Sequence, residues 1–223
     1  MSNIRGRLKK LTLWAFVNVV VGGLLFAVSG RWQDPWMWAY VITFSVPCLY
    51  ALLSIDEDLA RERFRPPEPS ADRLPLRAIR LFALAHLIIG ALDTGRWHLS
   101  HVPDAVRIIG LIGMLIAFML FFRAMVANRF FSAVVRIQRD RGHRVVDQGP
   151  YAVVRHPGYA GMILAMPFSA LALGSWLSLA TALVLSALTF RRVLFEDAFL
   201  RANLEGYAAY AGRVRYRLIP GVW

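Results

Sequence analysis

Cysteine is nearly absent from this chain of 223 residues, in which Cys48 is the single example. One cysteine excludes an internal disulfide and any metal or redox motif built on cysteine pairs. Cys48 lies inside an apolar run, so we expect it to be a packing residue. Internal repeats and low-complexity tracts are also missing, which argues against repeat architectures.

Acidic residues are scarce beside basic ones, with 14 Asp and Glu against 26 Lys and Arg and a net charge of +12. In a soluble protein, such an excess would suggest a nucleic-acid partner. However, 57% of the residues are hydrophobic, the mean hydropathy is +0.49, and the apolar residues come in blocks. These features are typical of polytopic membrane proteins, whose basic loops face anionic lipid. We therefore predict contacts with membrane lipids and none with nucleic acid.

Four long apolar runs are each predicted to form a membrane-spanning helix, at residues 11–29, 36–53, 76–92 and 105–125. The first run could instead be a signal peptide cleaved near Ala27, but its length favours a retained helix. The polar segment 54–75, which is rich in proline and charge, is predicted to be a loop.

Two shorter runs, 159–173 and 176–190, are separated only by Gly174 and Ser175 and predict a tight helical hairpin. About 15 residues reach about 22 Å, short of the roughly 30 Å hydrocarbon core, so whether the hairpin crosses stays open. Residues 196–211 have the spacing of an amphipathic helix. The predicted fold class is therefore all-α: a polytopic membrane protein of about six helices plus an amphipathic C-terminal helix.

The basic residues predict the orientation. With six crossings and a cytoplasmic N-terminus, only Arg31, Arg96 and Arg107 of the 26 Lys and Arg residues fall outside. The positive-inside rule therefore places both termini in the cytoplasm. The membrane would be the inner membrane in a bacterium or the endoplasmic reticulum in a eukaryote. The oligomeric state is left open.

Arg155 and His156 begin the hairpin beside a proline. From the residues alone, a snorkelling arginine with an interfacial histidine and an anion-binding helix N-terminus are about equally favoured. Arg191, Arg192 and Glu196 follow the hairpin, where an ion pair within one helix is the simplest interpretation.

Three other polar features have structural explanations. Arg123, near the end of the fourth run, is placed to snorkel, although an intramembrane arginine is also a candidate site residue. His86 lies in the middle of a run and is expected to bond to a neighbouring helix. His98 and His101 lack a third ligand nearby, so no metal site is predicted.

The segment GPYAVVRHPGYAG, residues 149–161, is followed by the apolar hairpin, an acidic helix start, GYAAYAGRV and RLIPGVW. Together these segments resemble the isoprenylcysteine carboxyl methyltransferase family, which is related to the phospholipid N-methyltransferases. The resemblance covers roughly residues 130–223, and the first three runs match only in being apolar.

The resemblance implies an integral membrane enzyme that uses S-adenosyl-L-methionine, releases S-adenosyl-L-homocysteine and has no Rossmann domain. Residues 1–127 would hold the N-terminal helices and a cytoplasmic loop, and residues 128–223 the catalytic region with its hairpin and tail. Arg191 or Arg192 would hold the substrate, with help from Arg123. The implied cofactor-binding residues are Gln138, Val146, Gly149, Tyr151, Arg155, His156, Tyr159 and Glu196.

The chemistry of that cofactor agrees with this assignment. Its carboxylate suits Arg155 and His156, its ammonium suits Glu196, and its sulfonium suits a tyrosine face. The chain departs from the family in having Glu196 followed by Asp197 where two glutamates are usual. The glutamine expected near the cofactor is either Gln138 or replaced by Arg136.

The methyl acceptor is predicted to be lipophilic and to enter from the bilayer. The favoured acceptor is an isoprenylcysteine-type carboxylate, or a thiol, because arginines would hold an anion and a carboxylate needs no general base. Phospholipid N-methylation is the first alternative and would need a base such as Glu196. A non-catalytic lipid-binding scaffold is the second. A transporter is disfavoured, because the charges gather on one side and not at the midplane.

Overall fold

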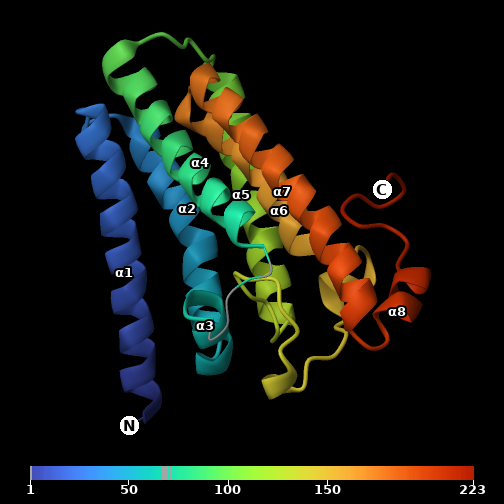
Figure 1. Ribbon diagram of the computed structural model, residues 1–223. Coiled ribbons are helices and arrows are strands. Elements are labelled where there is room, and N and C mark those ends of the chain that lie inside the picture. The colour runs from blue at the N-terminus through green and yellow to red at the C-terminus, as the bar shows by residue number, and fades with distance from the viewer. Residues whose placement is uncertain (1, 67–69, 71) are drawn as a thin grey trace.

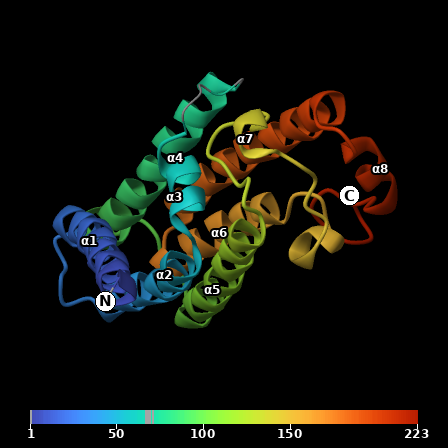
Figure 2. The same ribbon diagram turned by 90° about the horizontal axis from the view of Figure 1, so that it is seen from below.

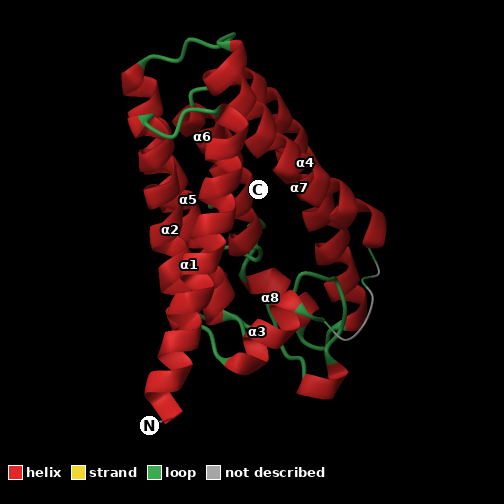
Figure 3. Cartoon of the chain, turned by 90° about the vertical axis from the view of Figure 1, so that its left-hand side faces the viewer, coloured by secondary structure: helices red, strands yellow, loops and turns green. Residues whose placement is uncertain are grey.

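The computed structural model describes residues 2–66, 70 and 72–223, which form helices and loops without a strand (Figures 1 and 3). Two short helices, α3 (Glu57–Phe64) and α8 (Tyr207–Arg213), lie at one end of the bundle. The longer helices are α1 (Ser2–Ser29), α2 (Pro35–Ser54), α4 (Arg73–Leu92), α5 (Asp104–Ala127), α6 (Pro157–Leu173) and α7 (Trp176–Asn203).

Four of the described helices, α1, α2, α5 and α7, are long and apolar enough to cross a membrane. Helix α6 packs between α5 and α7, α4 packs on α7, and α1 covers α2 and α4 (Figure 1). Large apolar side chains face outward, including Val19 (72% exposed), Leu81 (66%) and Ile116 (65%). Lipid tails can cover such a surface where water would not. The prediction of an all-α polytopic membrane protein is confirmed.

Glycines bring α5 and α6 into backbone contact. A Cβ on Gly161 of α6 would lie 2.6 Å from the backbone nitrogen of Phe121, and one on Gly110 of α5 would lie 2.4 Å from that of Ala172. Small residues at such crossings let membrane helices pack closely without a hydrophobic driving force. The contact fixes the start of α6, which carries several of the predicted site residues.

A buried polar network joins four helices inside the bundle. The His86 ring on α4 lies 2.8 Å from the hydroxyls of both Ser169 on α6 and Ser178 on α7. The hydroxyl of Tyr40 on α2 lies 2.7 Å from that of Ser169. The prediction that His86 bonds to a neighbouring helix is confirmed. Cys48 is also buried, as expected of a packing residue.

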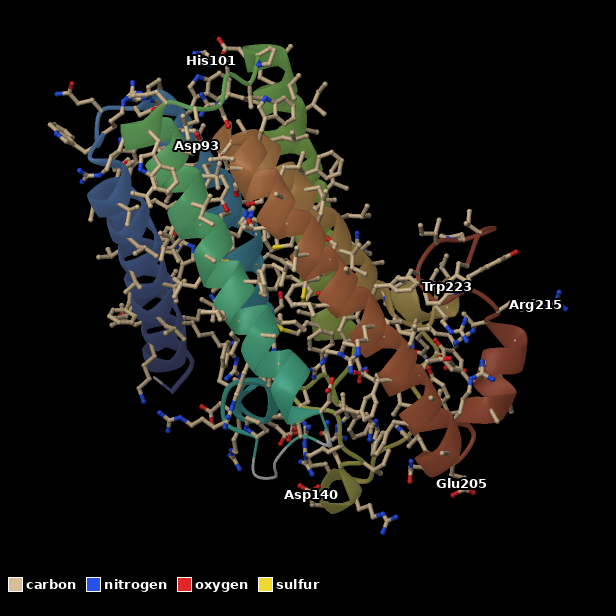
Figure 4. The ribbon with its side chains drawn as sticks, turned by 45° about the horizontal axis from the view of Figure 1, so that its top comes forward. Asp93, His101, Asp140, Glu205, Arg215 and Trp223 are labelled. Atoms are coloured by element: carbon tan, nitrogen blue, oxygen red, sulfur yellow. The ribbon has the colours of Figure 1, made fainter. Side chains whose placement is uncertain are left out.

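The end of the bundle away from α3 and α8 is closed by polar contacts. The buried carboxylate of Asp93 accepts hydrogen bonds from Ser100 and Ser175. Arg96 donates to the carbonyl of Val28 (2.6 Å), and Arg107 donates to that of Leu173 (3.2 Å). Figure 4 shows Asp93 and His101 at this end, opposite Asp140 and Glu205.

Two predicted elements were wrong. Segment 54–75 is not all loop, because α3 forms within it. The carboxylate of Asp56 caps α3 by accepting from the backbone N–H of Leu59 (2.7 Å). Acidic residues fill its first turn and basic residues its last, as the helix dipole favours. These signals were present in the sequence.

Helix α7 does not end near residue 190 but continues through the charged residues to Asn203. Its 28 residues give a length of about 42 Å, enough to cross a bilayer. The predicted amphipathic helix over 196–211 is therefore divided between α7 and α8 by a turn at Gly206, where φ is +78°. Leu204 and Tyr207 still pack in one cluster with Tyr210.

Candidate functional site

A cavity of about 440 Å³ lies at the end of the bundle that carries α3 and α8. Figure 2 looks at this end, where the segment joining α5 to α6 spreads across to α7 and α8. One wall is apolar and comes from α4 and α6, with Leu76, Ile79, Ala83 and Met162. The rest of the lining forms an aromatic and polar wall, so the cavity suits a ligand with both characters.

The aromatic wall includes Phe130, His143, Tyr151, Tyr207 and Tyr210. The rings of Phe130 and His143 lie with their centroids 4.6 Å apart. Burial, helped by the positive charges of Arg136 and Arg141, lowers the pKa of His143 to about 4. His143 is therefore a neutral ring at pH 7, and the wall can stack on a flat or cationic ligand.

Asp197 on α7 holds the start of α6 and the C-terminal segment together. Its buried carboxylate accepts from Arg155 Nε (2.8 Å), the Tyr207 hydroxyl (2.9 Å) and Arg217 Nε (3.0 Å), and its Oδ1 lies 3.1 Å from His156 Nε2. Arg155 Nη1 donates to two further backbone carbonyls of the C-terminal segment. Arg155 thus has an internal partner for its charge, which argues against its predicted role as a donor to a ligand carboxylate.

A chain of hydrogen bonds crosses the cavity from α7 to α6 and back. Arg192 Nε donates to the Tyr159 hydroxyl oxygen (2.8 Å), and that hydroxyl donates to Glu196 Oε2 (2.6 Å). Arg192 Nη2 donates to the carbonyl of Ala133 (2.8 Å). Its Nη1 is buried without a hydrogen bond to any described residue, and the Asp72 carboxylate lies 3.9 Å away. Nη1 is therefore a buried donor whose hydrogen-bonding capacity the described residues leave unused.

Helix α3 is fixed to the α5–α6 segment by ion pairs. The buried carboxylate of Glu62 lies 2.8 Å from Arg136 and accepts from the Ser132 hydroxyl (2.7 Å). The hydrogen bond to Glu62 raises the pKa of Arg136. One turn earlier, Asp58 pairs with Arg141. Helix α3 and Asp197 both shape the cavity, and sequence reasoning missed their roles.

The structure brings most of the predicted site residues together. Arg123 and Arg191 are exposed and do not line the cavity. Gly149 also stays outside the lining, but its φ of +58° forms the turn that places Tyr151 in the wall. The predicted residues that line the cavity are Gln138, Val146, Tyr151, Arg155, His156, Tyr159, Arg192 and Glu196. Their roles as ligands stay predictions.

The fold and the cavity define an all-helical polytopic membrane protein with a polar, aromatic site at one end of its bundle. Residues 108–202 match the model of the Isoprenylcysteine carboxyl methyltransferase (ICMT) family. This region runs from α5 to α7 and holds the bonded chain of Arg192, Tyr159 and Glu196. Through this region the chain is similar to the isoprenylcysteine carboxyl methyltransferase family.

Curated relatives of similar sequence are named as protein-S-isoprenylcysteine O-methyltransferases. A probable protein-S-isoprenylcysteine O-methyltransferase of Oryza sativa subsp. indica is 33% identical over 120 residues, which are 53% of this chain and 60% of the relative. A protein-S-isoprenylcysteine O-methyltransferase of Schizosaccharomyces pombe is 38% identical over 90 residues, 40% of this chain and 38% of the relative. The chain thus spans 60% or less of these relatives.

Proposed function

We propose that the protein is a membrane methyltransferase that transfers a methyl group from S-adenosylmethionine to the carboxylate of a lipophilic, isoprenylcysteine-type acceptor. The supporting observation is the bonded chain of Glu196, Tyr159 and Arg192 in one cavity. It sets a carboxylate and a guanidinium on either side of one tyrosine, beside an apolar wall. The names of the curated relatives agree with this activity.

The lining residues fit S-adenosylmethionine by their chemistry. The Glu196 carboxylate would bind the ammonium of the cofactor, and the aromatic wall would bind its adenine and sulfonium. Helix α6 begins at the cavity with His156 and Gly158 in the lining, and its N-terminus would favour the cofactor carboxylate. Arg155 takes no part in this arrangement, because it is paired with Asp197.

When bound, S-adenosylmethionine supplies an electrophilic methyl group. An acceptor carboxylate oxygen would bond to the methyl carbon as the carbon–sulfur bond breaks and its electron pair stays on sulfur, so no proton moves. Arg192 would hold that carboxylate through Nη1, while Tyr159 and the Ala133 carbonyl fix its guanidinium. The apolar wall would exclude water and receive the acceptor's apolar chain. Such a displacement mainly requires that the acceptor oxygen is aligned with the methyl group and that water is excluded.

The charge distribution supports a cytoplasmic position for the cavity. It lies at the end of the bundle opposite Arg96 and Arg107, which the positive-inside rule places outside. Phospholipid N-methylation is the less favoured alternative, because Glu196, the nearest candidate base, already accepts a hydrogen bond from Tyr159.

The test is calorimetric titration of the detergent-purified full chain with S-adenosylhomocysteine. Glu196→Gln should weaken binding at least tenfold, about 1.4 kcal/mol, because the ammonium loses its counter-charge. Glu205→Gln is the matched control, since Glu205 is exposed beyond the end of α7. A folded wild type that binds no S-adenosylhomocysteine would refute the methyltransferase proposal and leave the lipid-binding scaffold.

A further inference from the structure

Arg63, on the last turn of α3, faces the cavity from outside the region that matches the family. Its guanidinium lies over two aromatic rings, 5.7 Å from the centroid of Phe131 and 6.0 Å from that of Phe121. No hydrogen bond or ion pair joins it to another residue within the described parts of the chain. The rings hold the guanidinium in place by cation–π attraction and leave its N–H groups free to donate.

The position of Arg63 is fixed from the other side of α3. Asp58 and Glu62, one turn apart on this helix, pair with Arg141 and Arg136 of the α5–α6 segment. Arg63 follows Glu62 directly and is half-buried. A binding group on such an anchored helix is held in place before a ligand arrives, which lowers the entropy cost of binding.

Positive charge accumulates around Arg63. Arg80 and Arg192 line the same cavity, and the acids near Arg192 are Glu196, joined to it through Tyr159, and Asp72, at 3.9 Å. Burial lowers the pKa of Arg63, and the charges of Arg192 and Arg80 lower it further, against an opposing effect of Tyr159. Charged groups in a partly dry cavity are costly without counter-charge, so an anionic ligand would be favoured here.

We propose that Arg63 is a specificity-determining residue that binds the acceptor's carboxylate together with Nη1 of Arg192. This inference rests on the proposed function and adds a group that the family match does not reach. Two guanidinium groups disfavour a cationic or protonated amine acceptor and favour a carboxylate. The apolar wall on α4, which includes Leu76 and Ile79, lines the same cavity and would take the acceptor's lipophilic chain.

The experiment compares wild type, Arg63→Gln, Arg63→Lys and Arg61→Gln in the detergent-purified full chain. Arg61 is the matched control, because it is an exposed arginine on the same short helix. The acceptor probe is an S-farnesylated N-acetylcysteine, assayed for methyl transfer. Arg63→Gln should raise the acceptor KM at least tenfold, about 1.4 kcal/mol, and leave the affinity for S-adenosylhomocysteine within twofold. The acceptor KM of Arg63→Lys should lie between those of wild type and Arg63→Gln, because lysine keeps the positive charge but lacks the planar guanidinium that binds a carboxylate with two hydrogen bonds.

A second readout does not depend on turnover. Direct binding of the acid is compared with binding of its uncharged methyl ester, which has the same lipophilic chain. Wild type should prefer the acid, and Arg63→Gln should reduce that preference at least tenfold. An acceptor KM and an acid-over-ester preference equal to those of Arg61→Gln would overturn the inference. So would equal losses for acceptor and S-adenosylhomocysteine, which would show that Arg63 supports the fold.

Failure of the proposed function has a different signature. In that case the wild type neither binds S-adenosylhomocysteine nor methylates the probe. The acid-over-ester comparison then still decides whether Arg63 contributes to an anion site in this cavity. A preference that disappears in Arg63→Gln supports the anion site, and its absence in wild type overturns it.

Discussion

Asp197→Asn is expected to destabilise the protein more than any exposed charge substitution, because Asp197 ties α7 to α6 and to the C-terminal segment. The substitution keeps the size of the side chain and removes its charge. Arg155 then stays buried without a counter-charge, since its side chain is only 2% exposed. Its remaining donors already serve backbone carbonyls, so it has no second anion to pair with among the described residues.

The expected magnitude follows from burial. Removing one partner of a buried ion pair costs about 3–5 kcal/mol, because the surviving charge is left uncompensated. Arg201 and Arg217 also contact Asp197, but their side chains are 43% and 31% exposed, so water can solvate them after the change. The loss should therefore come mainly from Arg155. For a chain of this size, it corresponds to a fall of roughly 6–20 °C in melting temperature.

The assay is thermal unfolding of the detergent-purified protein, followed by tryptophan fluorescence. Asp147→Asn is the control, because Asp147 pairs with Arg213 at 3.0 Å with side chains 47% and 63% exposed. An exposed pair of this kind contributes about 0–1 kcal/mol, so the control should shift the melting temperature by under about 4 °C. Adding Arg155→Met to Asp197→Asn removes the orphaned charge and should restore part of the loss.

Equal melting temperatures for Asp197→Asn and Asp147→Asn would refute this reasoning. Arg155 would then not depend on Asp197 for its counter-charge. The sequence-based interpretation, in which Arg155 donates to a cofactor carboxylate, would be favoured again.

Two further predictions concern packing and protonation. Gly161→Ala should destabilise the protein by about 1–3 kcal/mol in the same assay, because the added Cβ would clash with the α5 backbone. The control Gly212→Ala adds a Cβ with nothing within 4 Å and should be tolerated. Equal effects of the two substitutions would contradict the close α5–α6 contact. The pKa of His143 is about 4 in the folded protein and about 6.5 in the unfolded chain. Between these two pH values the unfolded chain therefore binds more protons than the folded protein. The free energy of unfolding should consequently fall as the pH drops from about 6.5 to about 4. His143→Phe should flatten that part of the melting-temperature profile, and an unchanged slope would exclude His143 as its source.

Hydrophobic runs predicted the spanning helices well, because a helix in lipid needs a long stretch of apolar side chains and little else. Helices α2 and α5 start and end within two residues of the predicted runs. The same signal failed at α7, where charged residues suggested an end. The helix continues there because Arg192 and Asp197 find partners on other elements, which a hydropathy pattern cannot register.

The residues of the candidate site also divide into those that the sequence predicted and those that it did not. Local motifs pointed to Tyr159, His156 and Glu196, since these residues lie in short segments with recognisable chemistry. Asp197 was visible only as a departure from a usual pair of glutamates. The position of Arg63 in the lining could not be predicted, because Arg63 and Arg192 line one cavity only after α3 folds against the α5–α6 segment.

The sequence by itself therefore determined the class of protein, the spanning helices α1, α2 and α5, and the segments that carry the chemistry, because composition and periodicity act locally along the chain. Which charges stay free for a ligand was decided only by the tertiary structure. Arg155 and Arg192 look alike in sequence, as basic residues near an apolar run. Long-range contacts pair the first with Asp197 and leave Nη1 of the second, 3.9 Å from Asp72, without a hydrogen bond to any described residue.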